Sequence, residues 1–364
     1  MTILDTSVAD PMGSTHPLQH DYQRFLQLGS RRIPHTLYVH ERGYRSGTIN
    51  TDALGMRYSH FAGKRFSVAE RGGLARVNLL VGGSTAMGIG ASSDEHTVAS
   101  YLSLLTGEIW LNLAGCGLNA TQELLMFLTH QHRFGQIGHV VVFSGLNTLA
   151  QETLGEIMTS AQAAQTGQQD YFNRFHEGVQ PTEEPRRESL WQRLGHALAP
   201  RRPGPCPALE PVSSPDKRLI RAADSIGRTL RQWDRLLADG HTTLTFILQP
   251  LLPWCREALP AGEQAMLERL EQQPSNFDRL IDGAFDSQLH MAFFRRIKSQ
   301  ADPVSCYDMN SMLSSSPVFA ESLFADRLHF NDLGNNALAK VITAKLGLAQ
   351  EKYAQRKVTP IKLV

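Results

Sequence analysis

Three short apolar runs constrain the fold of this 364-residue chain more than any other feature. They extend from Val77 to Val81, from Ile109 to Leu113 and from His139 to Ser144. Runs without polar alternation are typical of strands that are buried on both faces, as in a parallel sheet covered by helices. We therefore expect three strands of one parallel sheet within residues 77 to 147.

Helical patterns separate these runs. Residues 92 to 95 (Ser-Ser-Asp-Glu) offer a capping box for a helix through Leu105, and residues 121 to 132 have apolar side chains at helical spacing. Further along the chain, residues 243 to 248 and 303 to 307 predict a fourth and a fifth strand, and residues 332 to 346 predict a closing helix. The sequence thus predicts the α/β class.

Residues 150 to 240 interrupt this alternation. Eight prolines stand between Val179 and Pro215 and exclude a continuous helix or strand there, so we expect an insertion loop or lid. Helical spacing then returns the chain to the core, with apolar positions at Leu219, Ile220, Ala223, Ile226, Leu230 and Trp233. We expect residues 1 to 49 to form an N-terminal arm and residues 50 to 364 to form one domain with this insertion.

Composition and charge exclude several classes of protein. Apolar residues make up 41% of the chain and charged residues 20%, as in an ordinary soluble globular protein. Lys and Arg total 36 against 35 Asp and Glu, a net charge of +1, which predicts no nucleic-acid partner. No apolar stretch approaches the ~20 residues of a membrane-spanning helix, and residues 1 to 35 lack the apolar segment of a secretory signal.

The four cysteines are Cys116, Cys206, Cys255 and Cys306, and they are widely separated. They show no spacing typical of a zinc site, so we expect no metal. We interpret them as reduced thiols and predict a cytoplasmic protein without disulfides.

Two segments carry residues suited to nucleophilic catalysis. The turn Gly82-Gly83-Ser84 follows the first strand and would project the Ser84 hydroxyl at the carboxyl edge of the sheet, where open α/β sheets bind ligands. Asp326 stands three residues before His329, so its carboxylate could accept the Nδ1 proton and leave Nε2 as a general base. Taken singly, the turn also fits a packing or phosphate-binding role, and the Asp/His pair also fits a helix cap.

Two further segments end strands at the same predicted edge. Gly117 follows the second strand and Asn147 follows the third. A glycine amide and an asparagine side-chain amide are hydrogen-bond donors of the kind that an oxyanion hole requires. In a parallel sheet both would lie beside Ser84.

Together the four segments resemble the blocks of the SGNH, or GDSL-type, esterases and lipases. Ser84, Gly117, Asn147 and His329 match the block residues, and Asp326 would be the triad acid. Supporting context comes from Asn112 before Gly117, Gly145 before Asn147, the segment from Asn50 to Arg57, and Gln249-Pro250. The resemblance covers residues 50 to 150 and 243 to 346. It implies a three-layer, flavodoxin-like fold with a parallel sheet of five strands.

The chain departs from the family pattern at two positions. Gly83 stands where the family usually has Asp before the serine, and Thr148 stands where Asp usually follows the asparagine. Neither departure removes a member of the implied triad or a donor of the implied oxyanion hole, which would comprise Ser84, Gly117 and Asn147.

The resemblance implies a serine hydrolase that cleaves a carboxylic ester of a small metabolite, lipid or carbohydrate and needs no cofactor. An acyltransferase would form the same acyl-enzyme and pass the acyl group to an alcohol, amine or thiol. A third possibility is a non-catalytic protein that uses the pocket of this fold to bind a ligand.

Overall fold

The computed structural model describes residues 21–22, 24–26, 28, 30–33, 37–70, 76–159, 213–238, 241–272, 281, 283–284 and 286–348. The proline-rich segment and Cys206 lie outside these residues, as do most of the predicted insertion and the first 20 residues of the predicted arm.

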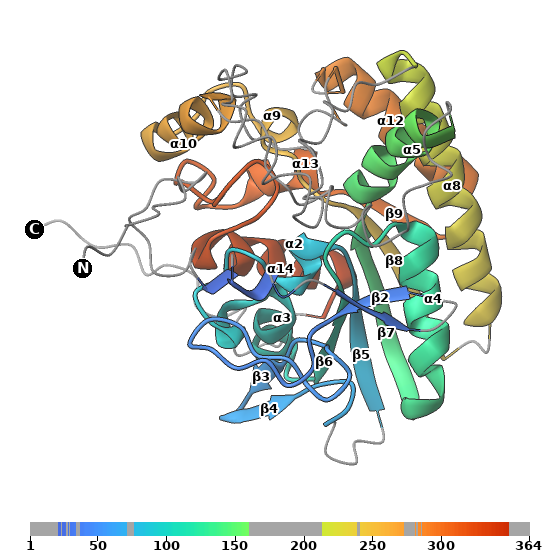
Figure 1. Ribbon diagram of the computed structural model, residues 1–364, viewed down its shortest axis with the longest axis vertical. Helices are drawn as coiled ribbons and strands as arrows, with labels where there is room; N and C mark the ends of the chain where they lie inside the picture. The colour runs from blue at the N-terminus through green and yellow to red at the C-terminus, as the bar shows by residue number, and fades with distance from the viewer. Residues whose placement is uncertain are drawn as a thin grey trace, which may run out of the picture.

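Five parallel strands form the central sheet (Figure 1). They are β5 (Arg76–Gly82), β6 (Trp110–Ala114), β7 (Gln136–Ser144), β8 (Thr243–Leu248) and β9 (Ser305–Asp308). Their order across the sheet is β6-β5-β7-β8-β9, in which the second strand along the chain lies at an edge beside the first. This is the flavodoxin-like order, so the predicted fold class is confirmed. Each of the five predicted strands overlaps an observed one.

Helices cover both faces of the sheet (Figure 1). On one face, α3 (Val98–Thr106) packs against α14 (Asp332–Leu346). On the other, α8 (Pro215–Leu236) packs against α4 (Ala120–His130), α5 (Leu146–Thr159) and α12 (Ser287–Ala301). Adjacent β5 side chains alternate between two cores, with Leu79 facing one and Leu80 the other. This explains why the strand has no polar alternation.

Two of the helical predictions need correction. The predicted capping box at residues 92 to 95 begins only a 3₁₀ turn, η1 (Asp94–His96), with Ser93 as its N-cap, because the Ser92 hydroxyl donates to Asp332 Oδ2 instead of capping a helix. The helix α3 begins later, with the Thr97 side chain capping it. In α8 five of the six predicted apolar positions are buried, but Ile220 is 43% exposed because it lies on the solvent side of the helix.

Shorter elements lie around the sheet. Two antiparallel hairpins pair β1 (Ser30–Ile33) with β2 (Leu37–His40) and β3 (Ser59–Phe61) with β4 (Lys64–Phe66). The structure also describes the helices α2 (Ser84–Met87), α9 (Leu252–Cys255), α10 (Ala261–Gln272) and α13 (Met309–Met312), and the 3₁₀ turns η2 (Gln131–Arg133) and η4 (Leu313–Ser315).

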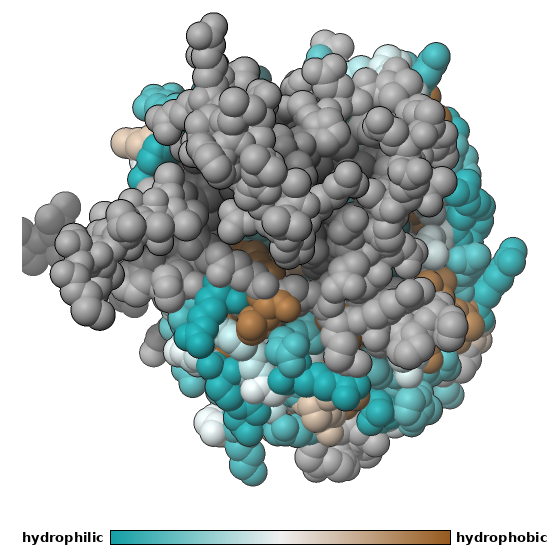
Figure 2. Space-filling model, viewed as in Figure 1, coloured by the Kyte–Doolittle hydropathy of each residue, from teal (hydrophilic) through white to brown (hydrophobic). Residues whose placement is uncertain are grey.

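The described surface on the face shown in Figure 2 is mostly hydrophilic, with hydrophobic residues in small groups. Such scattered groups are ordinary for a globular protein. Among the described residues, no helix combines the length and the apolar character needed to cross a membrane.

Candidate active site

Ser84 is the first residue of α2, and only Gly83 separates it from the end of β5. The turn between them depends on Gly82, whose φ of 155° is rarely adopted by residues with a side chain. A Cβ atom on Gly82 would also lie only 2.1 Å from the carbonyl oxygen of Phe143. This sharp turn places Ser84 at the carboxyl edge, between β6 and β7, where the strand order reverses direction.

Ser84, His329 and Asp326 form a continuous chain of hydrogen bonds. Ser84 Oγ lies 2.7 Å from His329 Nε2, and His329 Nδ1 lies 2.6 Å from Asp326 Oδ2. An ionised Asp326 can only accept, so the chain requires the proton of the neutral imidazole on Nδ1, which leaves Nε2 to accept from the serine hydroxyl. All three residues are partly exposed, so a substrate can reach them.

Backbone geometry fixes the Asp326 carboxylate. Its Oδ1 accepts hydrogen bonds from the amides of Leu328 and His329, each at 2.8 Å. Burial raises the pKa of Asp326, but the charge and hydrogen bond of His329 and the two backbone hydrogen bonds outweigh it and lower this pKa below its usual value. Asp326 is therefore ionised at neutral pH.

Gly117 and Asn147 lie beside Ser84. Asn147 is 5% exposed and donates from Nδ2 to the Leu118 carbonyl at 3.0 Å, which leaves its second N–H for another acceptor. Gly83 passes so close that a Cβ atom on it would lie 2.3 Å from Asn147 Nδ2. Among the described residues, the amides of Ser84 and Gly117 have no hydrogen-bond partner. Three candidate N–H donors, from Ser84, Gly117 and Asn147, thus belong to the turn that carries Ser84 and to the two segments that pack against it.

Two buried side chains support the far end of α2. Asn112 Nδ2 donates to the carbonyls of Ala86 and Met87, both at 3.2 Å. Arg57 is fully buried, donates to the Gly88 carbonyl at 2.7 Å and forms a 2.8 Å ion pair with Asp94. These bonds satisfy the last carbonyls of a four-residue helix that cannot bond them internally.

Thr85 joins α2 to the loop that carries His329. Its hydroxyl donates to the Leu328 carbonyl at 3.2 Å and accepts from Gln249 Nε2 at 3.1 Å. Thr85, which follows Ser84, is therefore bonded to Leu328, which precedes His329.

Two neighbours of the site were not predicted from the sequence. His40 Nε2 accepts a hydrogen bond from the Cys116 amide at 2.9 Å, and Gln151 Nε2 donates to the Gly117 carbonyl at 2.5 Å. Gln151 follows Asn147 by four residues and so shares its helix face, a spacing visible in the sequence. His40 gives no such signal, because it stands 76 residues before Cys116.

The described residues give little support to a cysteine nucleophile or to a metal site. Burial raises the pKa of the Cys116 thiol to about 12, so this sulfur is protonated at neutral pH. Cys116, Cys255 and Cys306 are free thiols. The described residues contain no group of three or more His, Cys, Asp or Glu that could hold a metal ion.

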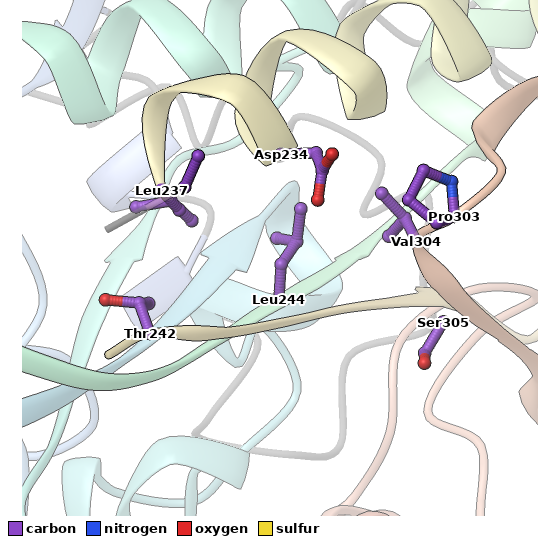
Figure 3. A pocket seen from close by; sticks show the side chains of 8 residues that line it. Asp234, Leu237, Thr242, Leu244, Pro303, Val304 and Ser305 are labelled. Atoms are coloured by element: carbon purple, nitrogen blue, oxygen red, sulfur yellow. The ribbon is translucent and has the colours of Figure 1, made fainter. Parts of the chain in front are cut away.

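A pocket of about 290 Å³ lies at the opposite end of the sheet (Figure 3). It is lined at the amino ends of β8 and β9 by residues such as Thr242, Leu244 and Ser305, and by Asp234 and Leu237 at the end of α8. Asp234 is the only ionisable side chain in this lining. The pocket contains no nucleophile and base pair and is not a candidate active site.

Comparisons with known proteins found similar structures but no similar sequences. No family model matches the sequence, and no curated protein matches it. Among solved structures, a lipolytic G-D-S-L family protein from Veillonella parvula is 10% identical with a TM-score of 0.40, and 75% of this chain and 98% of that chain are covered.

A lipase from a goat rumen metagenome is 12% identical with a TM-score of 0.38, and the match covers 74% of this chain and 97% of that one. A lipase/acylhydrolase from Enterococcus faecalis is 13% identical with a TM-score of 0.33, covering 76% and 97%. At these identities, an assignment of function depends on the geometry of the site.

Proposed function

We propose that this protein is a serine hydrolase of SGNH type that cleaves a carboxylic ester, with Ser84 as nucleophile, His329 as general base and Asp326 as the acid that orients it. The observation that carries the proposal is the unbroken chain from Ser84 Oγ through both ring nitrogens of His329 to Asp326. Such a chain activates an otherwise weak hydroxyl nucleophile.

In the proposed first step, His329 Nε2 takes the hydroxyl proton as Ser84 Oγ attacks the ester carbonyl. Asp326 holds the ring in place and stabilises the imidazolium. The amides of Ser84 and Gly117 and the free N–H of Asn147 donate to the oxyanion. Collapse of the tetrahedral intermediate expels the alcohol, to which His329 returns the proton.

In the second step, a water molecule accepts the acyl group from Ser84. His329 removes a proton from a water molecule, whose oxygen attacks the acyl carbon. The Ser84–acyl bond then breaks to release the carboxylic acid, and His329 returns the proton to Ser84 Oγ. Atoms balance with water as the only co-reactant, and the proposed steps require neither a metal nor an organic cofactor. A small metabolite, lipid or carbohydrate ester is the substrate class that we propose.

The order of the blocks along the chain supports the family part of the proposal. Ser84 and His329, 245 residues apart, are hydrogen-bonded, and the segments of Gly117 and Asn147 contact the Gly82–Gly83 turn, which supports this proposal. We propose that residues 50 to 364 form the hydrolase domain, with an insertion at about 150 to 240 and residues 1 to 49 as an arm.

Covalent labelling tests the nucleophile. A fluorophosphonate probe should label the wild-type protein and should fail to label Ser84→Ala, whose melting temperature should stay near that of the wild type because Ser84 is partly exposed. Undiminished labelling of Ser84→Ala would remove Ser84 from its proposed role. Labelling of another serine would relocate the site.

Product analysis tests the reaction. The protein should release carboxylic acid from p-nitrophenyl esters of increasing chain length, and Ser84→Ala and His329→Ala should both abolish this release. Acid formation without any added alcohol supports hydrolysis. Turnover that appears only with an alcohol, amine or thiol acceptor would overturn hydrolysis in favour of acyl transfer.

A further inference from the structure

We propose that His40 and Gln151 are positioning residues that hold the Gly117 amide in line for the oxyanion. This inference rests on the proposed function, because it concerns a donor in the proposed oxyanion hole. Both side chains bond the backbone of the loop that follows β6. Each acts through the backbone of the loop from Gly115 to Leu118.

The two side chains bind on either side of the peptide that carries the donor. The Gly117 N–H belongs to the planar unit between Cys116 and Gly117. His40 Nε2 accepts from the Cys116 amide, in the unit before it, at 2.9 Å. Gln151 Nε2 donates to the Gly117 carbonyl, in the unit after it, at 2.5 Å. With both flanking units held, the central unit has little freedom to rotate.

The loop needs such support because its own bonds are few. Gly115 donates to the Gly82 carbonyl at 3.1 Å, and Leu118 donates to the Gly115 carbonyl at 3.4 Å. Gly117 itself has a φ of 72°, in the left-handed region that glycine adopts freely. A flexible residue at the donor position makes the orientation of its amide depend on outside contacts.

His40 is held firmly enough to act as such a contact. It is 5% exposed, and its ring lies 4.9 Å from the ring of Phe25, measured between centroids. A Cβ atom on Gly55 would lie 2.4 Å from the His40 carbonyl oxygen, so the backbone turn at Gly55 packs directly on this residue. To accept from Cys116, Nε2 must carry no proton.

Gln151 is held by α5 and by a second hydrogen bond. Its Oε1 accepts from Asn119 Nδ2 at 2.5 Å, which fixes the direction in which its Nε2 points. One turn earlier on α5, Asn147 donates to the Leu118 carbonyl. The same helix face thus binds the carbonyls of two successive loop residues, Gly117 and Leu118.

The effect on turnover can be estimated from what the amide contributes. Removing one oxyanion donor typically costs about 10²-fold to 10³-fold in kcat. Loosening the amide without removing it should cost less, so we expect His40→Leu and Gln151→Met each to lower kcat by about tenfold to a hundredfold. KM should change by less than about threefold.

Conservative variants separate positioning from stability. His40→Gln offers an amide oxygen in place of Nε2 and should recover most of the kcat that His40→Leu loses. Gln151→Glu keeps the acceptor for Asn119 but cannot donate to Gly117, so it should lose kcat as Gln151→Met does. His139→Leu is the matched control, because His139 lies on β7 away from the carboxyl edge and its Nδ1 has no partner among the described residues.

A trifluoromethyl ketone provides a readout that a purely structural role would not move. This inhibitor adds to the serine and presents an oxyanion, so its inhibition constant should rise in the two variants by the same factor as kcat/KM falls. The double variant His40→Leu/Gln151→Met should lose no more than the ~10³-fold expected for one whole donor. If His40→Leu does not fold, His40→Gln and the two Gln151 variants still carry the test.

The two proposals fail in different ways. An active Ser84→Ala protein would refute the proposed function. An inactive Ser84→Ala protein together with wild-type kcat in His40→Leu and Gln151→Met would refute the positioning role alone. The positioning role would also be refuted if the His139→Leu control lost as much kcat as these variants, or if the affinity for the trifluoromethyl ketone did not change in proportion to kcat/KM.

Discussion

Gly83, the residue before Ser84, should be required for full activity, and Gly83→Ala tests this directly. Gly83 has φ −87° and ψ −154°, an extended conformation open to any residue. A methyl group at this position therefore causes no backbone strain. Its effect comes from the space beside it, where the added Cβ would lie 2.3 Å from Asn147 Nδ2 and 3.9 Å from the Leu118 carbonyl oxygen.

The required displacement sets the size of the effect. Ordinary contacts of a Cβ atom begin at 3.4 Å, so the Asn147 amide would have to move by about 1 Å. A displacement of 1 Å in a catalytic group can cost about 10²-fold, or roughly 2.7 kcal/mol in the barrier. Overpacking should also lower the free energy of unfolding by about 1–3 kcal/mol. Asn147 is buried and bonded to Leu118, so it has little room to adjust.

The assay compares kcat on a short p-nitrophenyl ester among Gly83→Ala, Asn147→Ala and the double variant. Removing the Asn147 side chain removes the clash, so the double variant should be no slower than Asn147→Ala alone. Gly47→Ala is the matched control, because nothing lies within 4 Å of its Cβ position. Wild-type kcat in folded Gly83→Ala would refute the reasoning, as would a double variant far slower than Asn147→Ala.

Two further predictions concern stability. Arg57→Met should lower the free energy of unfolding, measured in urea, by about 3–5 kcal/mol, since it leaves the Asp94 carboxylate buried without its ion-pair partner. The control Arg65→Met removes a half-exposed ion pair and should lower it by less than ~1 kcal/mol. Equal losses in the two variants would refute the argument. Burial raises the pKa of Glu123 to about 8, so the native state is favoured when this carboxyl is protonated, and its contribution to stability is lost as pH rises from about 4.5 to 8. Glu123→Gln should remove this pH dependence, so its free energy of unfolding should exceed that of the wild type by an amount that grows to about 4 kcal/mol between pH 4.5 and pH 8. The reasoning would be contradicted by an unchanged pH profile in Glu123→Gln, or by the same change in the control Glu95→Gln, whose side chain is exposed.

The sheet could be predicted from the sequence because its signal is local. The strands β5, β6 and β7 are buried on both faces, so their apolar runs are recognisable without knowledge of their neighbours. The start of α3 differs from the prediction because Ser92, the expected N-cap, bonds Asp332, which lies 240 residues away in the sequence. Side-chain partners so distant in sequence leave no periodic pattern.

The candidate site shows the same division. The Asp326 and His329 pair was predictable because three residues suffice to fold the carboxylate back onto the ring. The placement of Ser84 followed from the glycine turn after a strand. The contact of His40 with Cys116 was not predictable, because a single histidine before the first strand of the sheet has no local feature that indicates its partner.

The two departures from the family pattern have one structural context, the first turns of α5. A Cβ atom at Gly83, where the resembled family usually has aspartate, would lie 2.3 Å from Asn147 Nδ2, so any side chain there requires the Asn147 amide to move. Thr148, at the other departure, uses its hydroxyl to accept from the Ala120 amide at 3.0 Å and so satisfies the start of α4. With Gln151 bonded to Gly117, the helix contacts the loops of both preceding blocks. A carboxylate introduced at position 83 alone would therefore have to displace Asn147, and the residues at both positions have packing or capping contacts with the first turns of α5.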